Sequence, residues 1–249
     1  MYNFFSNNRD GDRFIIEGAD FNHIKNVLRM KEGEEFLVSF EGQSHLCRLS
    51  ALYSDYLIAE ITEENYRETE LPIQIYLFQG LPKGDKMELI IQKCTELGVS
   101  KIIPVEMKRC VVKLDDKKKK SKRERWQSIS ESAAKQSKRN VIPEVCDVLS
   151  FDNALKMAKD LDIFLVPYEN KDGMKATKEA LSKIKEGMSV GVFIGAEGGF
   201  DDAEIQKAME AGGISVSLGK RILRTETAAV TALSMCMLYA EMNLSGEDK

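Results

Sequence analysis

From Ile73 onward the chain alternates short apolar runs with amphipathic ones, and this alternation constrains the fold more than any other feature of the sequence. Apolar runs of strand length cover residues 73–78, 101–105, 163–166, 190–194 and 214–218. A helical pattern, with apolar residues three or four positions apart, covers residues 83–97, 117–137, 202–211 and 225–243. Strands and helices that alternate in this way build a largely parallel sheet covered by helices. We therefore predict an α/β domain over residues 71–249.

The first 70 residues follow a different pattern and predict a small β-rich domain. Runs with apolar and polar residues in alternation predict strands at 13–17, 35–40, 45–49 and 56–61. One short helix is expected at 21–28, with Asp20 as its N-cap. The segment 62–72, TEENYRETELP, is polar and acidic and ends in proline, so we predict a linker between two domains there.

Composition argues against a metal centre and against membrane association. The chain has two histidines and five cysteines, and no two cysteines lie close enough for a CxxC pair. This usage favours a reducing compartment over a disulfide framework or a zinc site. The N-terminal MYNFFSNNRD lacks the pattern of a signal peptide, and the apolar stretch 228–240 is too short to cross a bilayer. We expect a cytoplasmic protein with no metal.

The net charge of −4 at first speaks against a nucleic-acid partner, but the charges are unevenly distributed. Residues 117–139 contain ten basic and two acidic side chains, whereas residues 1–70 contain seven basic and fourteen acidic ones. A local concentration of lysine and arginine is the pattern expected where a protein contacts phosphates. A solvated helix face without a partner is the alternative interpretation.

Two loops of the α/β domain are candidates for a ligand site, and the first is FIGAEGGF at 193–200. It follows a predicted strand and precedes a predicted helix, where ligands of α/β proteins bind, and its glycines let the backbone approach a ligand closely. Its spacing matches neither phosphate-binding motif, and Glu197 would repel a phosphate. Asp201 and Glu204 are expected to form a capping box at the helix start. A neutral or cationic ligand, such as an adenosine that carries a sulfonium and an amino acid, therefore fits better than a phosphate. A tight turn with no ligand is the alternative.

The second loop is LGKRILRTETA at 218–228. Here too a predicted strand ends at a glycine, and Thr225 is expected to cap the helix that follows. Two loops at neighbouring strand ends can enclose one ligand from both sides. The last helix is apolar on nearly every face, so we expect it to be buried in its own core, or partly against a second subunit.

FIGAEGGF and LGKRILRTETAAVTAL strongly resemble the SPOUT class of RNA methyltransferases. Within that class, the match is to the family that methylates N3 of a uridine in 16S (small-subunit) ribosomal RNA. Further segments resemble the same family, so that the resemblance spans most of the chain: HIKNVLRM at 23–30, KGDKME at 83–88, ELGV at 96–99 and SAAKQSKR at 132–139.

The resemblance implies a PUA-like β-barrel domain for RNA binding at 1–70 and an α/β-knot domain at 71–249, whose tail forms a deep trefoil knot. It also implies a homodimer, 16S ribosomal RNA within the small ribosomal subunit as the substrate, and S-adenosyl-L-methionine as the cofactor. The two loops match the cofactor-binding motifs, and they contain the expected cofactor residues Ile194, Gly195, Glu197, Gly198, Gly199, Leu218, Gly219, Ile222, Leu223, Thr225, Thr227 and Ala228.

The expected roles in methyl transfer follow from position in these loops. Arg224, with Arg221 second, is expected to stabilise negative charge that develops on the uracil oxygens. Glu226 is expected to orient that arginine or to accept the N3 proton, and a simple surface ion pair with Arg224 is the alternative. The expected RNA contacts are the basic residues Arg9, Lys25, Arg29, Arg125, Lys135, Lys138 and Arg139.

Three rival functions share parts of this pattern. A SPOUT methyltransferase that modifies a ribose 2′-hydroxyl would use the same loops. A non-catalytic RNA-binding assembly factor would keep the fold but would not need the two loops intact. A nucleotide-binding enzyme is disfavoured by Glu197 and by the missing P-loop lysine. Binding of S-adenosylmethionine separates the methyltransferases from the other two.

Overall fold

The computed structural model describes residues 1–168 and 173–244, and these residues form two compact units. The first unit is Met1–Glu70 together with Ala134–Ile142, and the second is Leu71–Ala133 together with the chain from Pro143 onward. The segment Ala134–Ile142 therefore packs with the N-terminal residues, although the sequence-based division placed it in the second domain.

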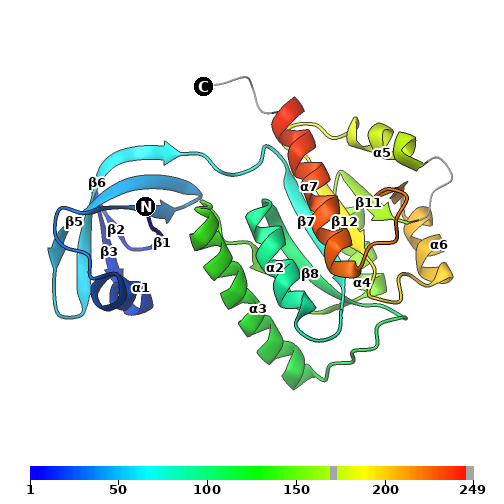
Figure 1. Ribbon diagram of the computed structural model, residues 1–249, viewed down its shortest axis with the longest axis horizontal. Helices are drawn as coiled ribbons and strands as arrows, with labels where there is room; N and C mark the ends of the chain where they lie inside the picture. Colours follow the sequence, from blue (N-terminus) through cyan, green and yellow to red (C-terminus); the bar gives the residue numbers. More distant parts are fainter. Residues whose placement is uncertain (169–172, 245–249) are drawn as a thin grey trace. The chain divides into compact units, whose positions relative to one another are not determined.

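The first unit is built on a six-stranded sheet in the order β1-β4-β5-β6-β3-β2 (Figure 1). Its strands are β1 (Asn3–Phe5), β2 (Arg9–Asp10), β3 (Arg13–Glu17), β4 (Glu35–Phe40), β5 (Gln43–Leu52) and β6 (Tyr56–Arg67). The β1–β4 pair is parallel and the remaining pairs are antiparallel. Alternating residues of these strands face one buried core, which includes Phe4, Phe14 and Phe36.

Two expectations from the sequence are wrong in detail for this unit. Strand β6 continues to Arg67, so residues 62–67 of the predicted linker belong to this strand, and Glu63 and Arg67 pair with β5. The predicted helix is a short α1 (Gly18–Asn22) that continues as a π-helix, η1 (His23–Leu28), and its N-cap residue is Glu17 rather than Asp20. Instead, Asp20 forms an ion pair with Lys135 at 2.7 Å.

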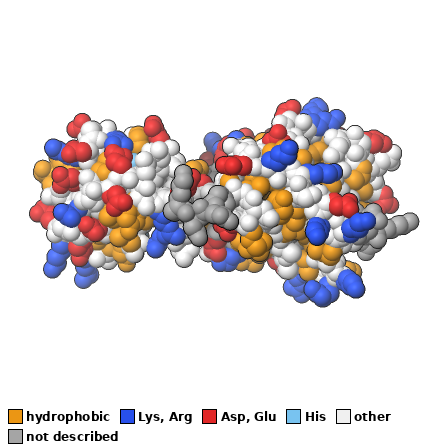
Figure 2. All heavy atoms as spheres, turned by 90° about the horizontal axis from the view of Figure 1, so that it is seen from above, with side chains coloured by type: hydrophobic (Ala, Val, Ile, Leu, Met, Phe, Trp, Pro, Cys, Tyr) orange, Lys and Arg blue, Asp and Glu red, His pale blue; other side chains and the backbone are white. Residues whose placement is uncertain are grey.

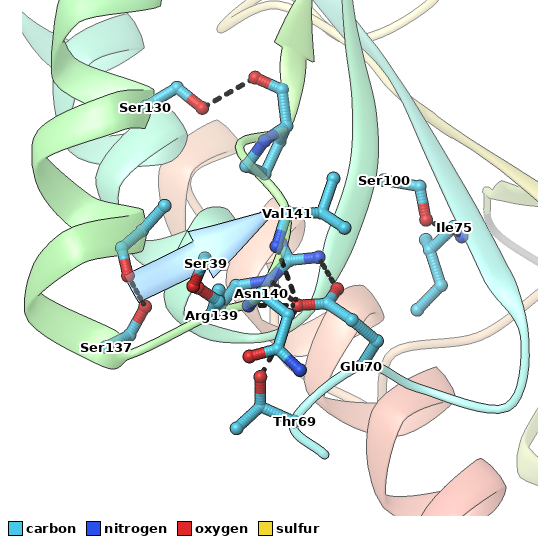
Figure 3. Close-up of polar contacts among 12 residues, drawn as sticks. Ser39, Thr69, Glu70, Ile75, Ser100, Ser130, Ser137, Arg139, Asn140 and Val141 are labelled. Carbon is cyan, nitrogen blue, oxygen red and sulfur yellow. Dashed lines mark hydrogen bonds and ion pairs between the residues drawn. The ribbon is translucent and has the colours of Figure 1, made fainter. Parts of the chain in front are cut away.

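A nearly buried ion pair attaches the segment Ala134–Ile142 to the rest of the first unit. The Arg139 guanidinium pairs with the Glu70 carboxylate, which also accepts hydrogen bonds from the backbone amides of Asn140 and Val141 (Figure 3). The side chain of Arg139 is 5% exposed. The backbone carbonyl of Arg139 accepts a hydrogen bond from the Asn3 side chain at 3.0 Å. Arg139 is therefore a structural residue here, and the expectation that it contacts RNA phosphate is wrong.

The second unit is a parallel sheet in the order β10-β8-β7-β12-β11-β13, with β9 paired to β8 (Figure 1). Its strands are β7 (Gln74–Gly80), β8 (Val99–Glu106), β9 (Glu144–Val145), β10 (Leu149–Ser150), β11 (Ile163–Pro167), β12 (Ser189–Ile194) and β13 (Ile214–Val216). Its helices are α2 (Lys86–Glu96), α3 (Asp116–Ser137), α4 (Phe151–Lys159), α5 (Gly173–Leu181), α6 (Asp202–Glu210) and α7 (Thr225–Asn243). The last turn of α3 belongs to the first unit.

The predicted α/β alternation is confirmed, because β7 and β12 are buried on both faces, as parallel strands between helices are. The rings of Phe78 on β7 and Phe193 on β12 stack at 4.3 Å between centroids. Helices α2 and α7 lie side by side and pack on β7, β8 and β12 (Figure 1). Four elements were not predicted from the sequence: the helices α4 and α5, which are as long as the predicted α6, and the strands β9 and β10. The two strands have only two residues each, which is too short for a clear period.

The last helix, α7, is buried on one face and partly exposed on the other. Ala229, Leu233 and Cys236 are fully buried, whereas Leu238 is 47% and Met242 72% exposed. In a single chain, therefore, only one face of α7 is buried in the core, and the expectation that the chain's own core covers the whole helix is not met. Among the described residues, no helix is long and apolar enough to cross a membrane.

Candidate active site

A cavity of about 720 Å³ lies at the C-terminal ends of β11, β12 and β13. Two loops form most of its wall: the glycine loop (residues 195–201, between β12 and α6) and the arginine loop (residues 217–224, between β13 and α7). Lys86 at the start of α2, Arg109 after β8, and Tyr168 after β11 complete the lining. This is the edge of a parallel sheet at which ligands bind in α/β proteins.

The structure brings most of the predicted site residues to this one cavity. The lining includes the expected cofactor residues Ile194, Gly195, Glu197, Gly198, Gly199, Leu218, Gly219, Ile222, Leu223, Thr225 and Ala228. Arg221 and Arg224 line it as well, whereas Thr227 and Glu226 do not. Thr227 is exposed on the surface of α7.

Thr225, which directly follows the arginine loop, joins the start of α7 to the glycine loop and to β7 by hydrogen bonds. Its hydroxyl donates to the carbonyl oxygen of Gly195 at 2.6 Å and accepts from the side-chain amide of Gln79 at 2.9 Å. Gln79 is the buried penultimate residue of β7, and Thr225 is 5% exposed. The expectation that Thr225 caps α7 is wrong, because Arg224 occupies the N-cap position and Thr225 is the first helical residue.

Two glycines allow the glycine loop to lie against β7 and to fold back on itself. A Cβ atom on Gly80, the last residue of β7, would meet the backbone nitrogen of Ala196 at 2.6 Å. A Cβ atom on Gly195 would meet the backbone carbonyl carbon of Gly199 at 2.9 Å. Since real Cβ contacts are longer than this, larger residues at these positions would displace the wall of the cavity.

Glu197 carries the carboxylate that lines the cavity, and α2 neutralises it. One carboxylate oxygen accepts hydrogen bonds from the Lys86 ammonium and from the backbone amide of Lys83, both at 2.9 Å. Partial burial acts to raise the pKa of Glu197, but these hydrogen bonds outweigh it and the net pKa is lowered. Glu197 therefore stays ionised at neutral pH, and its negative charge is balanced by Lys86.

Glu226 is placed differently from the expectation. Among the described residues Glu226 forms no ion pair with Arg224; its nearest cation is the Lys86 ammonium, 3.9 Å from Oε2. That oxygen is shielded from solvent and has no hydrogen-bond partner in the described part of the chain. Arg221 and Arg224 are exposed, and the described residues give neither of them a salt bridge, so both guanidinium groups remain available to a substrate.

The start of α6 closes the glycine loop through a capping box that confirms the prediction from sequence. The Asp201 side chain accepts from the Ala203 amide, and the Glu204 side chain accepts from the Asp201 amide at 2.9 Å. The other Glu204 oxygen accepts from the backbone amide of Lys108 at 2.8 Å. Arg109 donates to the carbonyl of Gly198 at 3.2 Å. The loop after β8 thus supports the glycine loop, and Arg109 of that loop also lines the cavity.

The basic side chains of the first unit that were expected to contact RNA differ in whether they already have a partner within the protein. Arg9 pairs with Glu64 at 2.5 Å, and Lys25 donates to two backbone carbonyls at residues 53–54. Arg29 is exposed and adopts a left-handed backbone conformation, with φ of 54°, where η1 ends. Figure 2 shows acidic side chains spread over the visible face of this unit, in keeping with its acidic composition.

On α3 and just after it, many of the basic side chains form ion pairs with carboxylates of the same chain. Arg125 pairs with Glu88 at 2.8 Å and Lys135 with Asp20 at 2.7 Å, while Lys138 is partly exposed, with a φ of 60°. Three more basic residues of α3 also pair with carboxylates: Lys118, Lys119 and Arg123. The basic segment therefore offers fewer free cations to a nucleic acid than its ten basic residues suggested.

Sequence reasoning missed Gln79, Lys86 and Arg109, which lie outside the two loops. The segment KGDKME at 83–88, which contains Lys86, resembles the methyltransferase family, but the resemblance assigns no role to this lysine. A polar glutamine at the end of an otherwise apolar strand was the signal for Gln79, because such a residue must find a hydrogen-bond partner when it is buried.

The cavity fits S-adenosylmethionine in size and chemistry. Its volume lies in the range of small-molecule sites, about 300–1,000 Å³. Apolar side chains such as Leu218, Leu223 and Ala228 suit an adenine ring, and the glycine backbone brings amides and carbonyls close to a polar ligand. The Glu197–Lys86 pair leaves this wall without net charge, and α6 begins with acidic residues that disfavour a phosphate.

Comparison with known families defines the class of the protein. The model of an RNA methyltransferase domain matches residues 69–237, and that of an RNA methyltransferase PUA domain matches residues 16–62. The fold and the cavity are thus those of an RNA methyltransferase with a PUA domain.

Individual relatives narrow this class. The chain is 44% identical to the ribosomal RNA small subunit methyltransferase E of Bacillus subtilis, over 92% of this chain and 91% of that protein. It is 36% identical to the enzyme of the same name from Mesomycoplasma hyopneumoniae, over 95% of this chain and 99% of that protein. The structure of the methyltransferase E of Neisseria gonorrhoeae bound to S-adenosyl methionine is 33% identical, with a TM-score of 0.81 over 98% of this chain and 100% of that one. The chain belongs to the ribosomal RNA small subunit methyltransferase E family.

Proposed function

We propose that this protein transfers the methyl group of S-adenosylmethionine to N3 of a uridine in 16S ribosomal RNA, in the cytoplasm. The observation that carries the proposal is the cavity at the sheet edge, in which the glycine loop and the arginine loop face one another and are joined through Thr225. The Neisseria gonorrhoeae relative was solved with this cofactor, and the Bacillus subtilis relative is named for small-subunit ribosomal RNA.

The cofactor supplies an electrophilic methyl group on a sulfonium. In our proposal the glycine loop and the apolar part of the arginine loop hold it, so that backbone amides and carbonyls, together with Leu218 and Leu223, fix its orientation. Glu197 and Lys86 provide a charge-balanced wall on one side. Thr227, which the sequence placed among the cofactor residues, is left out of this set because it faces away from the cavity.

Arg224 is the residue we assign to the uracil, with Arg221 second. N3 of uracil carries a proton, and negative charge grows on O2 and O4 as that proton leaves. An unpaired guanidinium at the cavity stabilises this charge through two parallel donors. Arg224 is the N-cap residue of α7, so its backbone is fixed by the helix that follows, and its side chain is exposed at the cavity. The target base leaves its stack to reach this position.

Glu226 does not fit the role of proton acceptor that the sequence suggested. It lies outside the lining of the cavity, and its nearest cation is Lys86 rather than Arg224. We therefore assign the N3 proton to solvent or to the RNA itself, and we give Glu226 a role through Lys86.

The proposal includes a homodimer, a knotted C-terminal segment and RNA contacts from both units. The exposed apolar residues Leu238 and Met242 on α7, and Ile222 in the arginine loop, which is 98% exposed, support an apolar contact with a second subunit. In our proposal the knot closes near the contact between Thr225, at the start of α7, and Gly195 of the glycine loop. For RNA we retain Arg9, Lys25, Arg29, Arg125, Lys135 and Lys138, and we expect Arg29 and Lys138, which have no acidic side chain as a partner among the described residues, to contribute most.

Methyl transfer from labelled S-adenosylmethionine tests the proposal. We expect the purified protein to label small ribosomal subunits or free 16S ribosomal RNA that lack the modification, and to leave large-subunit RNA unlabelled. Binding of the cofactor without transfer to either RNA would favour the non-catalytic assembly factor, and binding of ATP in place of the cofactor would favour the nucleotide-binding enzyme.

A further inference from the structure

The Lys86 ammonium occupies a position between two carboxylates from different loops. It donates to Glu197 of the glycine loop at 2.9 Å and lies 3.9 Å from Oε2 of Glu226 in the first turn of α7. Lys86 is the first residue of α2 and also lines the cavity. One cation therefore contacts both segments that enclose the proposed cofactor site.

The Lys86–Glu197 contact is open to solvent, as an ordinary surface ion pair is, and such a pair contributes little by itself. The shielded carboxylate of Glu226 is what separates this cluster from a surface ion pair. The side chain of Glu226 is 17% exposed, that of Glu197 28% and that of Lys86 34%. The Oε2 atom of Glu226 is fully shielded and has no hydrogen-bond donor among the described residues, so its charge depends on the nearby ammonium. Removal of a cation from such a place leaves two carboxylates without balance.

The same oxygen of Glu197 that receives the Lys86 hydrogen bond also receives one from the Lys83 backbone amide at 2.9 Å. The start of α2 thus holds Glu197 with two donors, one from the backbone and one from a side chain. The side chain of Lys83 is exposed and has no part in this contact. Lys83 lies next to Glu197 as Lys86 does but contacts it through its backbone alone, which makes substitution of the Lys83 side chain a suitable control.

We propose that Lys86 is a positioning residue of the cofactor site, which fixes the glycine loop through Glu197 and the start of α7 through Glu226. This inference rests on the proposed function, because the ligand in question is S-adenosylmethionine. In the free protein the ammonium holds the two carboxylates at the separation that the cavity requires. Its loss lets Glu197 leave the wall, so the cofactor binds more weakly while the sheet beneath stays intact.

The test is isothermal titration of the full-length protein with S-adenosylmethionine, together with thermal melting of each variant. We expect Lys86→Gln to raise the Kd about tenfold and Lys83→Gln to leave it unchanged. Lys86→Arg should restore most of the affinity, because arginine keeps the charge. In the Glu197→Gln background, Lys86→Gln should add less than a twofold further loss, since the two residues act as one unit.

A Kd for Lys86→Gln equal to that of Lys83→Gln would overturn the inference, and so would additive losses in the double variant. If Lys86→Gln fails to fold, Glu197→Gln removes the carboxylate partner of the same contact. An unchanged Kd of Glu197→Gln for S-adenosylmethionine would also contradict the inference. A wild-type protein that does not bind S-adenosylmethionine would overturn the proposed function and this inference with it. A wild type that binds, beside a Lys86→Gln that binds equally, would overturn the role of Lys86 alone.

Discussion

The hydroxyl of Thr225 donates a hydrogen bond to the carbonyl oxygen of Gly195 at 2.6 Å, across 30 residues of sequence. Because the same hydroxyl accepts from the Gln79 amide at 2.9 Å, the strand β7, the glycine loop and the start of α7 meet at a single buried side chain. The shape of the cavity therefore depends on a contact that neither loop makes alone.

Substitution of Thr225 by valine keeps the shape of the side chain and removes both hydrogen bonds. We expect Thr225→Val to lower the free energy of unfolding by about 1–3 kcal/mol, because the Gly195 carbonyl and the Gln79 amide lose their partner. The affinity for S-adenosylmethionine should fall with it. Thr227→Val, on the exposed side of the same turn, is the control and should change stability by less than about 0.5 kcal/mol in urea titrations. Equal effects of the two variants would contradict the role given to Thr225.

Alanine at Gly195 tests how tightly the glycine loop is folded. A Cβ atom there would meet the backbone of Gly199 at 2.9 Å, whereas at Gly198 it would meet the Cβ atom of Arg109 at 3.0 Å. The contact at Gly195 is with the backbone of the glycine loop itself, whereas the contact at Gly198 is with the loop after β8. We therefore expect Gly195→Ala to weaken cofactor binding more than tenfold and Gly198→Ala to weaken it less. Calorimetry with S-adenosylmethionine measures both. A Gly195→Ala variant that binds as tightly as the wild type would mean that the loop adjusts freely.

The ion pair between Arg139 and Glu70 should be worth far more than an exposed one. Arg139→Met leaves the Glu70 carboxylate without its cation, and we expect a loss of about 3 kcal/mol in the free energy of unfolding. Arg48→Met, which removes an ion pair with Glu35 whose side chains are 51% and 39% exposed, should cost less than about 1 kcal/mol. Urea unfolding, followed by circular dichroism, compares the two. Similar small losses would show that burial does not strengthen the Arg139 pair.

Buried thiols should make the protein less stable in alkaline solution. Burial raises the pKa of Cys236 to about 12 from its ordinary value of 9.0. Above pH 9 the unfolded chain releases this proton and the folded protein keeps it, so the stability falls as the pH rises, by about 1.4 kcal/mol for Cys236 at pH 10. Cys236→Ala should remove that part of the decline between pH 8 and pH 10. An unchanged decline in the variant would contradict the assignment to Cys236.

Much of the second unit follows from the sequence, because strands buried on both faces leave continuous apolar runs that alternate with amphipathic helices. The run at 73–78 overlaps β7 in all but its first residue, the run at 190–194 lies within β12, and the capping box at Asp201 and Glu204 forms as predicted. These features are local, so a few neighbouring residues determine them.

The features that could not be predicted depend on contacts between distant residues. Nothing near Arg139 in the sequence indicates that it pairs with Glu70, so a buried structural arginine was indistinguishable from a phosphate contact. Thr225 has the residue type of an N-cap, and its bond to Gly195 arises only when two strand ends meet in the sheet. The same applies to Lys86, whose partners lie 111 and 140 residues away.

Arg224 separates cofactor binding from catalysis in the proposed mechanism. We expect Arg224→Ala to reduce methyl transfer at least a hundredfold, because a stabilising donor at the developing charge is lost. The Kd for S-adenosylmethionine should stay within about twofold of the wild-type value. Arg221→Ala should have a smaller effect on transfer. An active Arg224→Ala would remove this residue from the mechanism.

The most direct test of the central claim is nucleoside analysis of 16S ribosomal RNA after incubation of small subunits that lack the modification with this protein and labelled S-adenosylmethionine. We expect the label to appear in N3-methyluridine, and we expect none with heat-denatured protein. Label in a 2′-O-methylated nucleoside would contradict the assignment of the base and make the protein a ribose methyltransferase. The absence of label from every nucleoside, with the cofactor bound, would contradict the claim that this chain is the enzyme for this RNA.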